Sequence, residues 1–336
     1  MIRKFFLKRS QNTNFRNLYW ITSGRAAFFN ILKDYKEKGF SKIYLPAYIC
    51  DSLIYPVNKL GLKILFYDLD DKLELINEFQ GNSIILLIHF FGKKIKNIEE
   101  IKKSFPKNSK IIEDFTHVFL NNNIFRKNNG NDYFFSLRKH FGFISGAYLY
   151  RDFKNEKINK KFTLIYKNSR DILDFKYNYL QKKNYKNLKV EEKYLKIIKK
   201  NDQLISSNLV NFQIPNIIRN FNNNLDLQRI RKKRKQNWNT LNELLKNKIE
   251  CFHSNFKNDE IPFGYIVKIK NRDEVKEKLK NMNVFAPIHW KWEAKINKKK
   301  YSNLYKLSKS VLTLPIDQRY DSSDMEVLAN KFKKLI

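Results

Sequence analysis

Residues 110–117 read KIIEDFTH, an apolar run that leads into the carboxylates of Glu113 and Asp114 and then to His117. Continuous apolar runs are typical of strands that are covered on both faces of a sheet. The stretch therefore predicts a buried strand with a carboxylate and an imidazole at its carboxyl end. In open α/β sheets ligands bind beyond that end of the strands. The other reading is that the acidic pair and the histidine are solvated loop residues.

Short apolar runs of the same kind lie on both sides of this stretch. They occur at 42–45, 63–69 (KILFYDL), 84–91 (IILLIHFF), 132–137 (DYFFSL) and 147–151 (AYLYR). Two segments with helical spacing lie among them: residues 26–38, which stop at Gly39, and residues 52–60, which stop at Gly61. Pro56 is expected only near the first turn of the second helix. Strands that alternate with helices predict an α/β fold with a mostly parallel central sheet.

The composition of the chain changes near residue 155. Residues 155–245 are rich in Lys and Asn and mostly helical in pattern, with a long helix expected at 225–246. The expected elements that follow are a strand at 262–270, a helix at 272–282, a strand at 311–316 and a final helix from Ser323, capped by Ser322-Ser323-Asp324. We therefore expect a large α/β domain at 1–155, a helical linking segment at 156–245 and a smaller α+β domain at 246–336.

The totals favour a packed globular protein. Hydrophobic residues make up 42% of the 336 positions, which argues against disorder. No apolar run approaches the roughly 20 residues that cross a bilayer, and no apolar stretch follows the basic N-terminus as in a signal peptide. The two cysteines, Cys50 and Cys251, lie far apart and lack partners for a metal site. A cytoplasmic location without a metal is the expectation.

The net charge of +34 admits three interpretations. It fits nucleic acid or an anionic membrane surface, but the lysines are spread along the chain, and Lys, Asn, Ile, Phe and Tyr are all abundant, as an AT-rich genome encodes. We favour this drift in composition. No zinc, RNA-binding or basic-zipper signature accompanies the charge, so no specific nucleic-acid partner is expected. A diphosphate substrate is the third interpretation, with Arg138, Lys291 and Arg319 as candidate contacts or as solvated cations.

Two further segments carry candidate chemistry. Ser23-Gly24-Arg25 opens the first helix, where backbone N–H groups and the helix dipole favour an anion, although a plain helix cap explains Ser-Gly equally well. Lys139 directly follows the apolar strand 132–137, and a low-dielectric pocket makes such a lysine nucleophilic. Ser136, three residues earlier, is placed to bind a phosphate.

The order and spacing of these segments resemble the DegT/DnrJ/StrS family of sugar aminotransferases, which use pyridoxal 5'-phosphate (PLP) and have the aspartate-aminotransferase fold type I. The resemblance covers nearly the whole chain. Its segments are Ser23–Ala27, LPAYICDSLI (45–54), KILFYDLD (63–70), LLIHFFG (86–92), EDFTH (113–117), FSLRKHFGFISGA (135–147), His289-Trp290 with its neighbours, and SKSVLTLPIDQRY (308–320).

The resemblance implies a role for each matched residue. Lys139 would bind PLP covalently and exchange protons with the substrate, Asp114 would face the pyridine nitrogen and His117 would lie beside the ring. Ser23, Gly24, Arg25 and Ser136 would hold the phosphate, and His289 and Trp290 would line the substrate site. Cys50 stands where the family has the aromatic side chain that stacks on the ring, which is a departure. The family also implies a homodimer.

We therefore expect an aminotransferase that moves an amino group, from glutamate, to a keto-sugar, nucleotide-linked, in surface polysaccharide biosynthesis. One alternative is a PLP enzyme of the same fold that decarboxylates, racemises or eliminates, because the same lysine and aspartate serve those reactions. The other alternative is a non-catalytic protein whose basic surface binds anions.

Overall fold

The computed structural model describes residues 18–76, 78–118, 132–141, 147–150 and 226–336, and single positions at 192, 196, 197, 199, 200, 203, 205 and 209. These residues fall into two compact units. The first unit draws on 1–37 and 132–226, and the second on 38–131 and 227–336. The domain boundaries expected at 155 and 245 stay a prediction.

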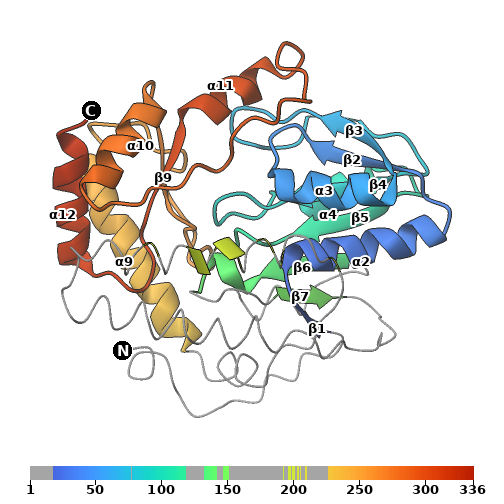
Figure 1. The fold of residues 1–336 in the computed structure, drawn as a ribbon, viewed down its shortest axis with the longest axis horizontal. Coiled ribbons are helices and arrows are strands. Elements are labelled where there is room, and N and C mark those ends of the chain that lie inside the picture. Colours follow the sequence, from blue (N-terminus) through green and yellow to red (C-terminus); the bar gives the residue numbers. More distant parts are fainter. Residues whose placement is uncertain are drawn as a thin grey trace. The chain divides into compact units, whose positions relative to one another are not determined.

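The first unit contains three strands and the helix that covers them. Strand β7 (Ala147–Tyr150) pairs antiparallel with both β1 (Leu18–Ile21) and β6 (Asp132–Ser136). Helix α2 (Gly24–Glu37) lies beside these strands (Figure 1) and buries its apolar face, with the ring of Phe28 centred 5.6 Å from that of Phe134. The 3-10 turn η1 (Leu137–Lys139) follows β6 directly, so the end of β6 fixes the position of Lys139.

The second unit begins with a parallel sheet in the order β5-β4-β2-β3. Its strands are β2 (Lys42–Pro46), β3 (Lys63–Tyr67), β4 (Ile84–Ile88) and β5 (Lys110–Asp114), and its helices are α3 (Asp51–Leu60) and α4 (Ile98–Lys103). Every residue of β4 is buried, as its unbroken apolar sequence predicts. Among the strands β1 to β7, the three pairs β2–β3, β2–β4 and β4–β5 are parallel and the two pairs of β7 are antiparallel. The predicted α/β class with a mostly parallel sheet is therefore confirmed.

The rest of the second unit is an α+β arrangement. Its elements are α9 (Leu227–Leu245), β8 (Tyr265–Lys268), α10 (Arg272–Asn281), α11 (Ser302–Ser310), β9 (Val311–Leu314) and α12 (Ser322–Lys333). Strands β8 and β9 pair antiparallel, and α9 lies beside α12 (Figure 1). Trp238, Leu241, Leu312 and Phe332 belong to an apolar core that α9, β8, α10, β9 and α12 share.

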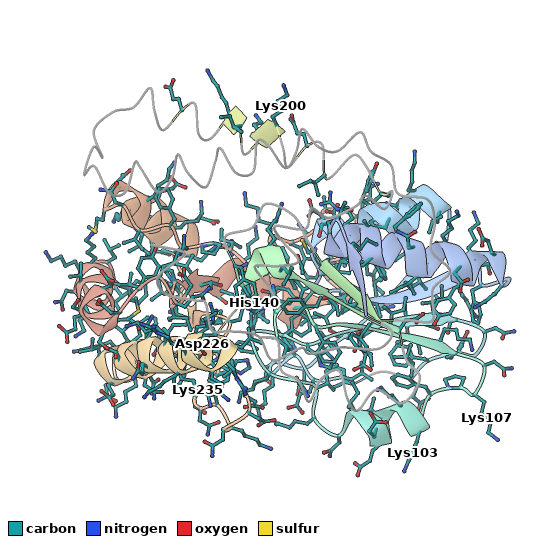
Figure 2. All side chains as sticks on the ribbon, turned by 90° about the horizontal axis from the view of Figure 1, so that it is seen from below. Lys103, Lys107, His140, Lys200, Asp226 and Lys235 are labelled. Carbon is teal, nitrogen blue, oxygen red and sulfur yellow. The ribbon has the colours of Figure 1, made fainter. Side chains whose placement is uncertain are left out.

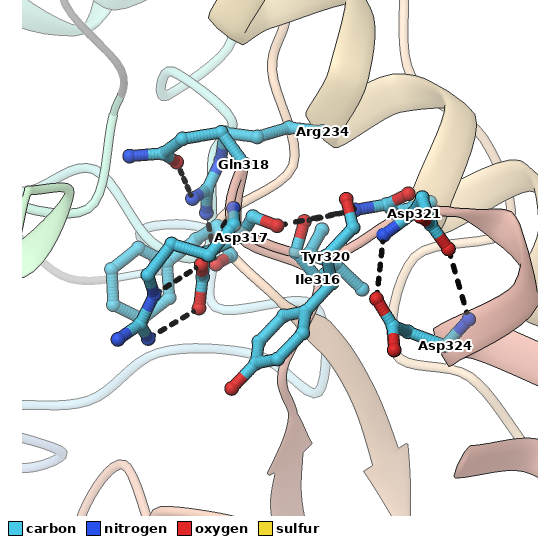
Figure 3. Close-up of polar contacts among 10 residues, drawn as sticks. Arg234, Ile316, Asp317, Gln318, Tyr320, Asp321 and Asp324 are labelled. Carbon is cyan, nitrogen blue, oxygen red and sulfur yellow. Dashed lines mark hydrogen bonds and ion pairs between the residues drawn. The ribbon is translucent and has the colours of Figure 1, made fainter. Parts of the chain in front are cut away.

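Buried polar side chains of α9 fasten the segment that follows β9 (Figure 3). Arg234 is only 2% exposed, and its guanidinium donates to the carbonyls of Pro262 and Phe263 and to the side-chain oxygen of Gln318. Asn237 Nδ2 lies within 3.2 Å of the carbonyl oxygens of three residues of that segment: Ile316, Asp317 and Tyr320. Side chains of α9 therefore hold this segment, which forms no strand.

Two local expectations need correction. Pro56 lies inside α3, past its first turn, where it removes one backbone hydrogen bond from a helix that buries Leu53, Ile54 and Val57 beside it. Helix α12 is capped by Asp321, one residue before the expected cap. The carboxylate of Asp321 accepts from Asp324 N–H, and that of Asp324 accepts from Asp321 N–H, so this reciprocal pair sets the start of the helix.

The surface carries much of the positive charge. Figure 2 shows Lys103 and Lys107 projecting outward from the region of α4. On α10 each lysine is matched by a glutamate, as in the pair Lys278–Glu274 at 2.6 Å. Such exposed pairs contribute little to stability. Among the residues that the structure describes, no helix is long and apolar enough to cross a membrane.

Candidate functional site

The N-terminus of α2 carries the first predicted group of cofactor ligands. Ser23 caps the helix: its Oγ accepts from Ala26 N–H at 3.1 Å, and its carbonyl accepts from Ala27 N–H at 2.9 Å. Ser23 therefore forms the helix cap that was one of the two interpretations of Ser23-Gly24. A cap does not exclude an anion, because the hydroxyl proton of Ser23 and the helix dipole still favour negative charge at this end.

Gly24 brings this helix start against the end of β6. A Cβ placed on Gly24 would lie 3.4 Å from the Cβ of Ser136 and 3.5 Å from the ring of Phe134, so a side chain at position 24 would touch both of these side chains. A side chain larger than alanine at position 24 would compete with Ser136 and Phe134 for the same space. The structure therefore brings together two segments that are 112 residues apart in the chain and that were both predicted to bind phosphate.

Lys139 lies on a turn that its neighbours anchor. The carbonyl of Leu137, a fully buried residue, accepts from His140 N–H at 3.1 Å and from Phe141 N–H at 2.9 Å. His140 is 3% exposed and its ring stacks on Phe135 at 5.2 Å. Lys139 itself is partly buried. The turn thus presents the lysine from a rigid frame. Gly142, Ser145 and Gly146 lie outside the described residues.

Asp114 is the last residue of β5 and is 5% exposed. Its Oδ1 accepts from Thr116 N–H at 2.7 Å, and its backbone carbonyl accepts from His89 N–H at 3.1 Å. The side chain is therefore oriented by the turn that follows it, while the main chain is tied to the end of β4. This is the strand-end carboxylate that the sequence predicted.

His117 lies in an aromatic cluster that also contains the predicted substrate residues. Its imidazole is 1% exposed and is stacked on Phe263 at 4.0 Å and on Trp290 at 5.0 Å. The ring of His289 meets it edge-on at 5.2 Å, and Phe91 lies 5.7 Å away. The structure therefore places His117, His289 and Trp290 together, as one site requires.

Tyr48 joins this cluster, although sequence reasoning gave it no firm role. Its hydroxyl donates to the carbonyl of His289, and burial raises its pKa, so it stays protonated. The ring of Tyr48 lies 5.6 Å from that of Trp290. His289 Nδ1 is in turn 2.8 Å from Thr313 Oγ1. Phe91 and Phe263 were also missed, and the only signal for Phe91 is its place at the end of an apolar run.

Cys50 occupies the N-cap of α3, between β2 and that helix. Its Sγ accepts from Ser52 Oγ at 3.1 Å and lies 3.5 Å from Asp51 Oδ1, contacts that lie within its own turn. Arg319, a candidate cation for a diphosphate, is half-exposed and forms a two-pronged ion pair with Asp317, with both N–O distances at 2.7 Å.

No protein-family model matches this chain, and no curated protein does. Solved structures do. The sugar aminotransferase CalS13 from Micromonospora echinospora matches at 10% identity with a TM-score of 0.62, over 95% of this chain and 87% of that one. A DegT DnrJ EryC1 StrS aminotransferase from Brucella abortus matches at 13% identity with a TM-score of 0.58, over 95% and 85%.

Spr1654 from Streptococcus pneumoniae, in its PLP form, matches at 12% identity with a TM-score of 0.63, over 99% of this chain and 92% of that one. At such identities the likeness concerns the fold alone. The chain therefore has the fold of the sugar aminotransferases, as its motifs predicted.

Proposed function

We propose that this protein is a PLP-dependent aminotransferase that transfers an amino group from glutamate to a keto-sugar, nucleotide-linked, in surface polysaccharide biosynthesis. The observation that carries the proposal is the close approach of the start of α2 to Ser136, three residues before Lys139. It joins an anion-favouring helix end to the strand that precedes the candidate lysine. The shared fold with sugar aminotransferases supports the same conclusion.

The residues of the first unit fit the phosphate of PLP. Ser23 and Ser136 would offer hydroxyl groups, and Gly24 would let backbone N–H groups approach the phosphate oxygens. Arg25 follows Gly24 in the first turn of α2 and would add a positive charge. A dianionic phosphate is the kind of group that a helix N-terminus with small residues binds best.

The residues of the second unit fit the ring. The Asp114 carboxylate would face the pyridine nitrogen, and a buried, oriented carboxylate is suited to keep a proton on that nitrogen. The His117 imidazole would lie beside the ring, and His289 and Trp290 would contact the sugar. At Cys50, the position of the family's stacking aromatic, a thiol would meet the ring instead.

The chemistry then divides between the cofactor and the chain. When bound, PLP supplies an electron sink for the carbon that loses or gains the amino group. Lys139 Nζ would anchor the cofactor and would move the proton between Cα of the amino donor and the cofactor carbon. Asp114 would hold the balancing negative charge, and the aromatic cluster around His117 would exclude water.

Two features of the setting belong to the proposal. A homodimer is expected from the resemblance. A cytoplasmic location is supported by Cys50 and Cys251, which are both free thiols.

The test uses the purified protein with PLP and then L-glutamate. The proposal predicts a visible absorption band of bound cofactor that glutamate converts to the spectrum of the pyridoxamine form, and that a nucleotide-linked keto-sugar restores. A bound-cofactor band that ignores glutamate while an amino acid loses CO2 or its chirality would favour the alternative PLP reactions. A protein that does not bind PLP would contradict the proposal, and the non-catalytic alternative would take its place.

A further inference from the structure

A buried polar network lies on the strand end that carries Asp114. Glu113 precedes Asp114 on β5, and because side chains alternate along a strand the two carboxylates point to opposite faces of the sheet. Glu113 is 2% exposed. Its Oε1 lies 2.8 Å from Lys102 Nζ of α4, and its Oε2 lies 3.0 Å from Nε2 of His89, which follows β4. Side chains from two other segments, α4 and the end of β4, therefore meet at this one carboxylate of β5.

His89 contacts the strand end at three points. Its ring nitrogen faces the Glu113 side chain, its backbone N–H donates to the Asp114 carbonyl at 3.1 Å, and its ring stacks on Phe115 at 4.1 Å. The residue before Asp114, Asp114 itself and the residue after it are thus all contacted by one residue, His89, through its ring and its backbone N–H. The ring is 1% exposed, so water does not compete for these contacts.

The protonation state of His89 follows from its partners. Nδ1 accepts from the backbone N–H of Ile95 at 3.0 Å, so the proton sits on Nε2 and is donated to Glu113. Burial lowers the pKa of His89, which keeps the ring neutral. Burial acts to raise the pKa of Glu113, but His89 and Lys102 outweigh it and hold the value at about 2. The charged pair is therefore Glu113 with Lys102.

We propose that Glu113 and His89 are positioning residues that fix Asp114 for the cofactor. The proposal rests on the function proposed above. Neither side chain is assigned a contact with substrate or cofactor. Both act by holding the main chain of Asp114, while the hydrogen bond from Thr116 N–H orients its carboxylate. A looser strand end would let that carboxylate turn away from its target.

The substitution Glu113→Gln tests this in a defined way. A glutamine amide has one acceptor and one donor end, whereas Lys102 and His89 both donate to Glu113. One donor must then face another donor. If the His89 proton moved to Nδ1, it would face the N–H of Ile95 instead. The variant therefore disturbs the network whichever way its amide turns.

The readout is the dissociation constant for PLP, measured by fluorescence titration at a temperature where circular dichroism shows each variant folded. We expect Glu113→Gln to raise it at least about tenfold. The matched control is Asn237→Ala, which removes a buried side chain with three hydrogen bonds in α9 and should leave the constant within about twofold of wild type. An equal rise in both variants would mean a general loss of stability and would overturn the proposal.

A second variant and a rescue complete the design. Phe115→Leu removes the ring that stacks on His89 and keeps every side-chain hydrogen bond of the network. It should raise the dissociation constant for PLP about threefold. If Glu113→Gln does not fold, the result for Phe115→Leu tests the positioning role by itself. Adding Lys102→Gln to Glu113→Gln restores a complete donor and acceptor set and should recover part of the affinity. Wild-type affinity in Glu113→Gln or Phe115→Leu overturns the positioning role and leaves the proposed function standing. Wild-type protein that fails to bind PLP overturns both.

Discussion

The imidazole of His89 donates its Nε2–H to the buried carboxylate of Glu113 across 3.0 Å, directly behind the strand end that carries Asp114. A neutral histidine beside a charged glutamate is a stable arrangement here because Lys102 neutralises the carboxylate from its other side. The pair links β4 to β5 where both strands end. The position of the candidate pyridine partner thus depends on residues that face away from it.

The phosphate assignment predicts the effect of Ser136→Ala. A hydrogen bond from a hydroxyl to a charged phosphate contributes about 1.5–3 kcal/mol, so the dissociation constant for PLP should rise about tenfold or more. Fluorescence titration measures it. Ser104→Ala, at an exposed position after α4, is the control and should bind PLP like wild type. Equal affinity in both variants would remove Ser136 from the site.

Arg234 should be a major contributor to the stability of the second unit. Arg234→Met leaves the carbonyls of Pro262 and Phe263 without their donor in a buried site, and the free energy of unfolding should fall by about 3 kcal/mol. Urea unfolding of the whole chain measures the change. Lys232→Met, at an exposed position of the same helix, should change it by less than about 0.5 kcal/mol. Similar losses in the two variants would contradict this account.

Gly92 is required by a close approach of two backbone segments. Its φ is +102°, and a Cβ there would lie 2.3 Å from the carbonyl oxygen of Ile261. Gly92→Ala should therefore lower the free energy of unfolding by about 3 kcal/mol. Gly39→Ala separates the two causes, because Gly39 has a φ of +90° but open space around it, and it should cost only about 1 kcal/mol. Equal costs would show that backbone strain alone acts at Gly92.

His253 should make the fold sensitive to acid. Burial, with a contribution from Lys93, lowers its pKa from 6.5 to about 3. Below pH 6.5 the unfolded chain therefore binds a proton that the folded chain does not, and stability falls as the pH falls. Between pH 7.5 and 5 this amounts to about 2 kcal/mol. Urea unfolding at both pH values should show that the free energy of unfolding falls less in His253→Asn than in the wild-type protein, by about this amount. Identical losses in the two proteins would refute the assignment.

Much of the fold could be predicted because its strands are short apolar runs. The runs at 84–91 and 110–115 became β4 and β5 with one to three residues trimmed from their ends. Strand β1 and helices α4 and α11 were missed. Helix α11 reads SNLYKLSKS and buries only Leu304, Leu307 and Ser308 along one face, which is too weak a pattern to stand out in a lysine-rich chain.

The candidate site was predictable segment by segment but not in its supporting contacts. Asp114 and Lys139 follow apolar runs, which marks them as strand-end residues in the sequence itself. Nothing local links Glu113 to His89 and Lys102, because the three come from different elements and meet only when the sheet forms. For the same reason the stacking of His117 on Phe263, 146 positions away, has no signal in the sequence.

Reductive trapping identifies the lysine that holds the cofactor, which we propose to be Lys139. The wild-type protein is incubated with PLP, reduced with borohydride, digested and mapped by mass spectrometry. We expect one stoichiometric phosphopyridoxyl mass increment, on the peptide that contains Lys139, and none on that peptide in Lys139→Ala. A stoichiometric increment on a different lysine, or no increment above that of surface lysines, would contradict the account.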